Sequence, residues 1–331
     1  MRPQGSRIRW VAPWSEPERG RAFADDVREG LGARPKRLSC VFLYDDAGSR
    51  LFDEITTLPE YYVTRAEREI LVERGAEIAR LVPQAGRLVE LGSGSSDKTR
   101  CLIGALLDAR GGLEYAPIDV SRGALERACR RLLIEFPRLR VTAVAADYQA
   151  GLRALSIGER SGSLIAWLGS SIGNLDRAEA ARFLAHVRER MGERDALLVG
   201  IDLRKDENVL ARAYDDAAGV TARFNRNLLA RINRELGGRF EPERFAHRAV
   251  VDGREGCVSM HLVAEEAHAV AIEALAMEAR FERGESIRTE RSYKYSLDEI
   301  EALAAAAGLA VRERWLDGGA RFSLNLFARA G

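Results

Sequence analysis

The chain has 331 residues, 46% of them hydrophobic and 31% charged, an ordinary composition for a folded protein that is long enough for more than one domain. Its 51 Lys and Arg nearly balance 50 Asp and Glu, which argues against nucleic-acid or membrane-surface partners. The four cysteines never form CxxC and the four histidines form no HxxxH pair, so we expect no metal site and a reducing cytoplasm.

The first part of the chain predicts an irregular lead-in followed by helices. Residues 1 to about 20 are rich in Pro, Arg and Gly, and their basic start lacks the apolar segment of a signal peptide. Helical patterns cover residues 18–31 and 67–81. The stretch between them mixes aromatics, acids and a proline and does not match a strand unit.

A β-α-β rhythm then begins and predicts a mostly parallel sheet with helices on both faces. The predicted strands are Arg87–Leu91, Leu113–Asp119, Arg138–Ala145, Ser163–Leu168 and Ala196–Asp202. The predicted helices between them are Thr99–Ala109, Gly123–Glu135 and Arg177–Arg190.

The rhythm breaks after residue 204, which indicates a second domain. Residues 207–236 predict one or two helices, and residues 257–270, 271–281 and 285–296 predict antiparallel strands, the middle one ambiguous with helix. A helix at 297–307 and strands at 310–315 and 321–328 could return to the first sheet.

The stretch LVELGSGSSDKTR, residues 88–100, has the features of a nucleotide loop. Gly92 and Gly94 allow a sharp turn and close approach of a ligand, and the next helix offers free N–H groups. A dinucleotide loop needs a third glycine where Asp97 stands, and a Walker loop needs a glycine before Lys98. Both phosphate-binding interpretations are therefore weakened, and a lone GxG is often only a tight turn.

Two acids at later strand ends favour an adenosine ligand. Asp119 ends the second strand, where a carboxylate can accept both ribose hydroxyls, and Asp147-Tyr148 follows the third, where an acid can accept from the adenine amino group. This order of strands, acids and glycines resembles class I S-adenosylmethionine-dependent methyltransferases. Adenosylmethionine carries no phosphate, which would explain the missing third glycine.

Longer stretches resemble one particular family, the histidine N-alpha-methyltransferases of ergothioneine biosynthesis (hercynine synthases). They are FLYDDAGSRLFDEITTLPEYYVTRAE, VELGSGSSDKTR, WLGSSIGNL, AYDDAAGVTARFNRNLLARINREL and RTERSYKY. The resemblance implies an α/β fold, with a class I Rossmann-like methyltransferase domain (66–204 and 295–331) and a smaller α+β substrate-recognition domain (20–65 and 205–294). It also implies a monomer that trimethylates the α-amine of L-histidine, with the substrate between the two domains.

The resemblance also implies roles for individual residues. Asn174 and Tyr214 would hold the amino-acid carboxylate, Glu290 and Ser292 would recognise the imidazole, and Met260 would pack beside the ring. The remaining pocket residues would be Thr221 and Phe224, with Tyr61 and Tyr44 near the reacting amine. The cofactor residues would be Gly92, Gly94, Lys98, Asp119, Asp147 and Tyr148. Arg291 should point to the other side of its strand from Glu290 and Ser292.

Alternatives stay open beside this interpretation. Taken singly, Glu290 is typical of a solvated strand face, Met260 of a core and Asn174 of a turn. An enzyme acting on another amino acid, such as tryptophan, would not favour a carboxylate at the position of Glu290. An NAD-dependent dehydrogenase would need the third glycine, an RNA methyltransferase would need a basic stripe, and a non-catalytic adenosylmethionine-binding protein remains an alternative.

Overall fold

The structure, a computed structural model, describes residues 7–12, 16–155, 157–158 and 162–330. The chain forms two compact units. Unit 1 comprises Met1–Pro13, Val63–Arg204 and Tyr293–Gly331, and unit 2 comprises Trp14–Tyr62 and Lys205–Ser292. The two functional domains expected from the sequence, 66–204 with 295–331 and 20–65 with 205–294, stay a prediction.

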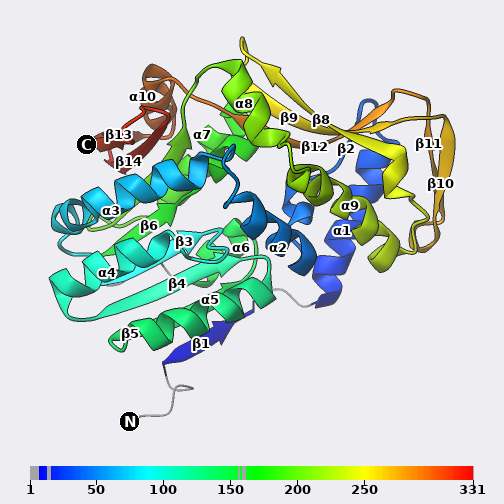
Figure 1. The fold of residues 1–331 in the computed structure, drawn as a ribbon. Coiled ribbons are helices and arrows are strands. Elements are labelled where there is room, and N and C mark those ends of the chain that lie inside the picture. Colours follow the sequence, from blue (N-terminus) through cyan, green and yellow to red (C-terminus); the bar gives the residue numbers. More distant parts are fainter. Residues whose placement is uncertain (1–6, 13–15, 156, 159–161, 331) are drawn as a thin grey trace. The chain divides into compact units, whose positions relative to one another are not determined.

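Unit 1 is built on an eight-stranded sheet with the order β1-β5-β4-β3-β6-β7-β14-β13 (Figure 1). The first six strands in this order are parallel, and β14 and β13 are antiparallel additions. Strands β3, β6 and β7 are buried at every position, as expected for parallel strands covered on both faces. The strands are β1 (Ile8–Val11), β3 (Arg87–Leu91), β4 (Leu113–Asp119), β5 (Leu139–Ala145), β6 (Ser163–Trp167), β7 (Ala196–Asp202), β13 (Leu309–Leu316) and β14 (Phe322–Arg329).

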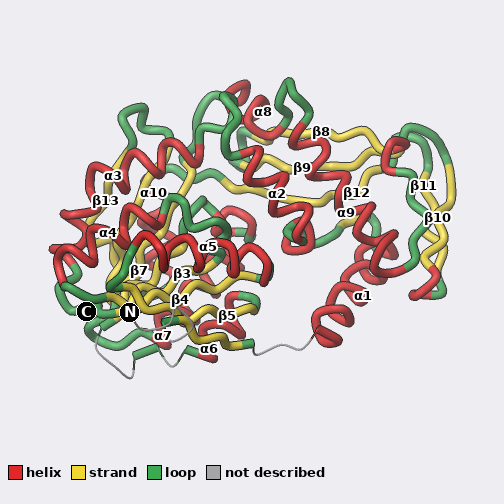
Figure 2. The backbone as a smooth tube through the Cα atoms, turned by 60° about the horizontal axis from the view of Figure 1, so that its bottom comes forward, coloured by secondary structure: helices red, strands yellow, loops and turns green. Residues whose placement is uncertain are grey.

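Helices cover both faces of this sheet. In Figure 2, α3 and α4 lie above the strands and α6 and α7 lie below them. The helices of unit 1 are α3 (Val63–Leu81), α4 (Thr99–Arg110), α5 (Arg122–Glu135), α6 (Tyr148–Ala154), α7 (Arg177–Arg190) and α10 (Leu297–Ala306). Asp176 is the N-cap of α7 and Ser296 is the N-cap of α10. Each forms a reciprocal capping box with the glutamate three residues later, which explains why these helices begin where they do.

The N-terminal segment departs from the sequence expectation. Residues 8–11 are not an irregular lead-in, because they form β1 and pair in parallel with β5, from Ile8 opposite Val141 to Val11 opposite Val144. Trp10 lies on this edge strand with the Arg122 guanidinium over its ring. Backbone pairing with an existing sheet edge is a tertiary effect, and it cannot be predicted from the sequence of a four-residue segment alone.

Unit 2 combines helices with a four-stranded sheet of order β2-β12-β9-β8 and a two-stranded β10-β11 ribbon. Helices α8 and α9 contact β8 and β9, and α2 packs on α9. The strands are β2 (Lys36–Arg37), β8 (Phe245–Asp252), β9 (Cys257–Ala264), β10 (His268–Ile272), β11 (Met277–Phe281) and β12 (Ser286–Tyr293). The helices are α1 (Glu16–Gly32), α2 (Asp46–Ile55), α8 (Glu207–Tyr214) and α9 (Val220–Leu236), with a short 3₁₀ helix η2 at Cys40–Leu43.

The ambiguous segment 271–281 contains the end of β10, one 3₁₀ turn and β11, so the strand interpretation is the better one. Besides β1, the elements α2, α6, β2 and β8 were not predicted from the sequence. Within the described residues, no helix combines the length and the apolar character needed to cross a membrane.

Candidate active site

The carboxyl ends of three adjacent strands carry the residues that were predicted to bind a nucleoside. Strands β4 and β3 are paired up to Ile118 and Leu91, and β5 and β4 up to Ala145 and Asp119. The glycine loop after β3 and the acids after β4 and β5 therefore share one edge of the unit 1 sheet. In open parallel sheets this edge is the usual place for ligands.

The glycine loop has the backbone conformation that glycine allows. Gly92 and Gly94 have φ of 70° and 49°, which side chains rarely tolerate. A Cβ at Gly92 would lie 2.8 Å from the Tyr148 hydroxyl, whereas a Cβ at Gly94 would meet nothing within 4 Å. Gly92 therefore permits contact with Tyr148, and Gly94 borders open space.

The two predicted ribose and adenine acids also organise their own loops. Asp119 accepts hydrogen bonds from the backbone N–H groups of Gly94 and Ser121, both at 2.8 Å. Asp147 caps α6 by accepting from the N–H of Ala150 at 2.7 Å. Each carboxylate oxygen has more than one acceptor site, so these bonds do not exhaust the capacity of either acid.

A buried polar network under the loop includes Glu90, which the sequence did not assign a role. Its carboxylate accepts hydrogen bonds from the hydroxyls of Thr99 and Tyr115, and Tyr115 in turn lies 2.9 Å from the Ser96 hydroxyl. Burial is the main cause that raises the pKa of Glu90 to about 7, against the opposing effect of these two donors. Ser96 has φ of 57°, so the network supports a strained residue of the loop.

Lys98 follows the loop directly and points to a second buried acid. Its ammonium forms an ion pair with Glu67 of α3, which also accepts from the backbone N–H of Gly169 after β6. Glu67 is the last residue of the segment FLYDDAGSRLFDEITTLPEYYVTRAE, which carries part of the family resemblance, but no role was predicted for it.

Unit 2 brings together two of the residues predicted to bind an amino acid. The hydroxyls of Tyr214, at the end of α8, and Ser292, in β12, lie 2.8 Å apart. Both residues are buried, at 8% and 3% exposure. A hydrogen bond between them connects a residue assigned to the carboxylate with one assigned to the imidazole.

His247 supports this pair from β8, and it was not predicted as a site residue. Its Nε2 lies 2.9 Å from the backbone carbonyl of Tyr214, and its Nδ1 lies 2.9 Å from the Asn225 amide nitrogen. Since the carbonyl can only accept and the amide nitrogen can only donate, the ring is the neutral tautomer with the proton on Nε2. Burial is the largest cause that lowers the pKa of His247, with Arg226 acting in the same direction and the carbonyl, Asp215 and Asp216 opposing it.

Predicted aromatic residues form a second cluster in unit 2. Tyr44 lies 5.4 Å from both Phe52 and Phe224, measured between ring centroids, and Phe52 lies 6.0 Å from Tyr61. The structure thus gathers Tyr44, Tyr61 and Phe224 around Phe52. Phe52 was not predicted as a site residue, although the same quoted segment contains it.

The remaining unit 2 residues lie on or near the sheet. Met260 is buried and lies opposite Ala249 of β8, which is two residues from His247. The side chains of Met260 and His247 therefore lie on the same face of the sheet, the face that α8 and α9 contact. Thr221 is in the first turn of α9, where its N–H donates to Asp216 at 2.7 Å.

Glu290 occupies an irregular part of β12. Burial alternates regularly from Ser286, but Glu290 and Arg291 are both half-buried and Ser292 and Tyr293 are both buried. The two-residue period therefore does not by itself assign Glu290 and Ser292 to one face. The charge of Glu290 contributes, after burial, to raising the pKa of the Cys40 thiol, so this carboxylate lies near η2.

Asn174 belongs to unit 1, unlike the other predicted substrate residues. It ends a 3₁₀ turn, Ser171–Asn174, that follows β6 and the left-handed residue Ser170. The N–H of Gly173 donates to the carbonyl of Ser170 at 2.9 Å, which holds this turn closed.

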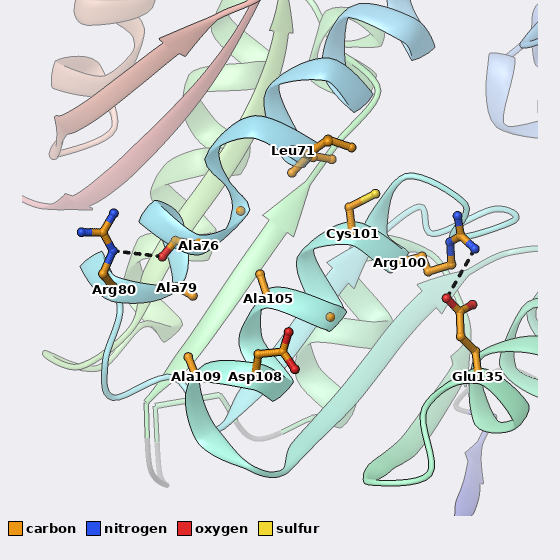
Figure 3. A pocket seen from close by; sticks show the side chains of 13 residues that line it. Leu71, Ala76, Ala79, Arg80, Arg100, Cys101, Ala105, Asp108, Ala109 and Glu135 are labelled. Carbon is orange, nitrogen blue, oxygen red and sulfur yellow. Dashed lines mark hydrogen bonds and ion pairs between the residues drawn. The ribbon is translucent and has the colours of Figure 1, made fainter.

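A shallow groove of about 680 Å³ between α3 and α4 contains none of the predicted site residues (Figure 3). Small side chains from both helices line it, and a Cβ at Gly75 would lie 3.3 Å from the Ala105 Cβ. The groove is explained by the small side chains through which α3 and α4 pack closely together. In the described part of the chain, no group of three or more His, Cys, Asp or Glu could hold a metal ion.

Comparison with known proteins gives one consistent result. A family model described as histidine-specific, SAM-dependent methyltransferase matches residues 23–329. The chain is 44% identical over 309 residues to the histidine N-alpha-methyltransferase of Mycolicibacterium smegmatis and 43% identical over 309 residues to that of Mycobacterium tuberculosis. Each match covers 93% of this chain and 95% of the relative. Ergothioneine biosynthesis protein 1 of Neurospora crassa is 31% identical over 304 residues, which cover 89% of this chain and 33% of that longer protein.

Proposed function

The chain belongs to the family of SAM-dependent, histidine-specific methyltransferases, and from this premise we propose that it methylates the α-amino nitrogen of L-histidine three times. The product is the betaine hercynine, and the reaction is the first step of ergothioneine biosynthesis. The observation that carries the proposal is the family match over residues 23–329, which includes residues of both compact units.

The residues of unit 1 fit adenosylmethionine as the methyl donor. Gly94 borders open space at the sheet edge, and the Ser93 hydroxyl is buried with no hydrogen-bond partner among the described residues. When bound, the donor supplies a methyl group on a positively charged sulfur. Asp119 would accept from the ribose hydroxyls, Asp147 with Tyr148 would hold the adenine, and Lys98 would pair with the carboxylate of the donor. Gly94 leaves room for this ligand, and Gly92 leaves room for the Tyr148 side chain beside it.

Histidine recognition is assigned to unit 2, with Asn174 of unit 1 predicted at the carboxylate. The carboxylate of Glu290 accepts a ring N–H of the substrate, and Ser292 contributes a hydroxyl that Tyr214 positions. A pocket built to hydrogen-bond a substrate group can reject analogues that lack the group by about 10⁴-fold, because its own polar atoms would be left without partners. This supports histidine over tryptophan as the substrate.

Methyl transfer requires the protein mainly to align the amine with the methyl donor and to exclude water. The nucleophile is an unprotonated amine, and a sulfide leaving group needs no acid. Positioning of the amine in a dry pocket is then the main contribution of the enzyme. Tyr61 and Tyr44, which lie in the aromatic cluster around Phe52, would assist loss of the ammonium proton before the transfer.

The surroundings of the enzyme are proposed from the same family premise. We expect a cytoplasmic monomer whose partner is the small molecule L-histidine. Gel filtration with light scattering would test the monomer.

The experiment that tests the function is mass spectrometry of a reaction with the purified protein, adenosylmethionine and an equimolar mixture of the twenty amino acids. The expected result is a gain of up to three methyl groups on histidine alone. A Glu290→Ala variant in the same mixture serves as the control for the imidazole contact. Methylation of another amino acid would contradict the substrate assignment, and binding of adenosylmethionine without any methylation would support a non-catalytic role.

A further inference from the structure

A fully buried carboxylate in unit 1 lies behind Lys98. The side chain of Glu67, on α3, has 0% exposure, and it forms the ion pair with the Lys98 ammonium. The backbone N–H of Gly169 donates to both oxygens of the same carboxylate, at 2.9 Å each. One acid thus joins the residue after the glycine loop of β3 to the turn after β6.

Two glycines make the space for this arrangement. A Cβ at Gly200, inside β7, would lie 2.0 Å from Oε1 of Glu67, and a Cβ at Gly169 would lie 3.1 Å from the Lys98 ammonium. Glycine inside a strand weakens the strand and often marks close approach by another group. Here that group is the Glu67 carboxylate, so the sheet itself accommodates the acid.

The position of Lys98 is not explained by helix stability. Lys98 is the residue before the first turn of α4, and its side chain makes no capping hydrogen bond. A cation at this end is unfavourable, because the helix dipole places partial positive charge there. The Lys98 side chain keeps 21% exposure, and an ammonium has three N–H donors, so it can bind Glu67 and still present a donor outward.

We propose that Glu67 is a positioning residue that fixes the Lys98 ammonium for the carboxylate of the methyl donor and holds the Gly169 turn in place. The inference rests on the proposed function, in which Lys98 contacts that carboxylate. The same turn leads to Asn174, so Glu67 also fixes the start of the segment assigned to the amino-acid substrate.

The test compares the binding of two ligands by calorimetry. S-adenosylhomocysteine carries the amino-acid part that Lys98 would contact, whereas 5′-methylthioadenosine lacks it. In Glu67→Gln, we expect the Kd for S-adenosylhomocysteine to rise roughly tenfold, as for the loss of a charge-assisted hydrogen bond, with the Kd for methylthioadenosine unchanged. Lys98→Gln should show the same selective loss. Glu73→Gln, an exposed position on the same helix, is the matched control and should change neither Kd.

The outcomes separate the two assignments. If Lys98→Gln weakens S-adenosylhomocysteine and Glu67→Gln does not, the positioning role is overturned while the contact of Lys98 stands. If neither variant changes it, the Lys98 contact is wrong and the inference fails with it. Equal loss of both ligands in Glu67→Gln would indicate general damage to the site and would also overturn the inference. Should Glu67→Gln not fold, Glu67→Asp carries the test, because it keeps the charge but withdraws it from Lys98.

Discussion

The hydrogen bond between Tyr214 and Ser292 gives a quantitative prediction for substrate binding. The two hydroxyl oxygens lie 2.8 Å apart and both residues are buried. A neutral hydrogen bond contributes about 0.5–1.5 kcal/mol, and a buried polar group that loses a partner costs about 1–3 kcal/mol. Because Tyr214 is proposed to orient the Ser292 hydroxyl for the imidazole, Tyr214→Phe and Ser292→Ala should each remove this one substrate contact and weaken histidine binding by about 1.4 kcal/mol, which is roughly tenfold in Kd.

The combined variant distinguishes this bond from two independent contacts. If both single changes remove the same bond, Tyr214→Phe with Ser292→Ala should lose about tenfold in total rather than about a hundredfold. The assay is calorimetric titration of L-histidine into enzyme saturated with S-adenosylhomocysteine. Thr289→Val is the control, since the buried Thr289 hydroxyl donates to the Met260 carbonyl and has no predicted contact with substrate. A full hundredfold loss in the double variant would refute the reasoning.

Three more predictions concern single charged or titratable groups. Glu290→Gln should lower kcat/KM for histidine about 10- to 100-fold through loss of a charge-assisted hydrogen bond, and an unchanged value in competition assays would remove Glu290 from the imidazole site. His247 must be neutral to accept from Asn225, and burial lowers its pKa, so histidine affinity should persist below the ordinary histidine pKa and fall only as the pH drops through the lowered pKa of His247. His247→Gln should lack that additional acid-side loss, and titrations of both proteins at several pH values compare them directly. Burial raises the pKa of Glu90 to about 7, so ionisation of Glu90 destabilises the folded protein as the pH rises from about 4.5 past 7. Glu90→Gln should therefore be more stable than wild type by up to about 3 kcal/mol at pH 8, and similar to it at pH 5. Thermal melts that show the same difference in stability at both pH values would contradict this.

The parallel strands of unit 1 could be predicted because each is a short apolar run bounded by turn residues. The predicted ends of β3, β4 and β7 agree with the structure to the residue. Strand β8 was missed because FAHRAVVD alternates polar and apolar residues only weakly, and its identity depends on pairing with β9. Strand β1 was missed for the same physical reason.

The site residues also fall into those that could be predicted from the sequence and those that could not. Residues within motifs, such as Gly92 and Asp119, could be predicted because one segment contains both the turn and its chemistry. Glu67 and His247 could not, since their partners are distant in sequence. Glu67 lies 31 residues from Lys98 and 102 from Gly169, and only the folded sheet brings them together.

Glu67 and Glu90, two of the buried acids of unit 1, have different partners, and the charge of one affects the pKa of the other. Glu67 is paired with an ammonium and a backbone N–H, whereas Glu90 accepts hydrogen bonds from the hydroxyls of Thr99 and Tyr115. The charge of Lys98 lowers the pKa of Glu90 and the charge of Glu67 raises it.

While the ion pair is intact, its two charges act on Glu90 in opposite directions and partly cancel. Removing only Glu67 leaves the Lys98 charge uncompensated, which favours the ionised form of Glu90 beneath the glycine loop. An effect transmitted through Glu90 would disturb the loop as a whole and weaken methylthioadenosine as well as S-adenosylhomocysteine. An effect transmitted through the Lys98 ammonium would weaken S-adenosylhomocysteine alone, and this is why the comparison of the two ligands identifies the route by which Glu67 acts.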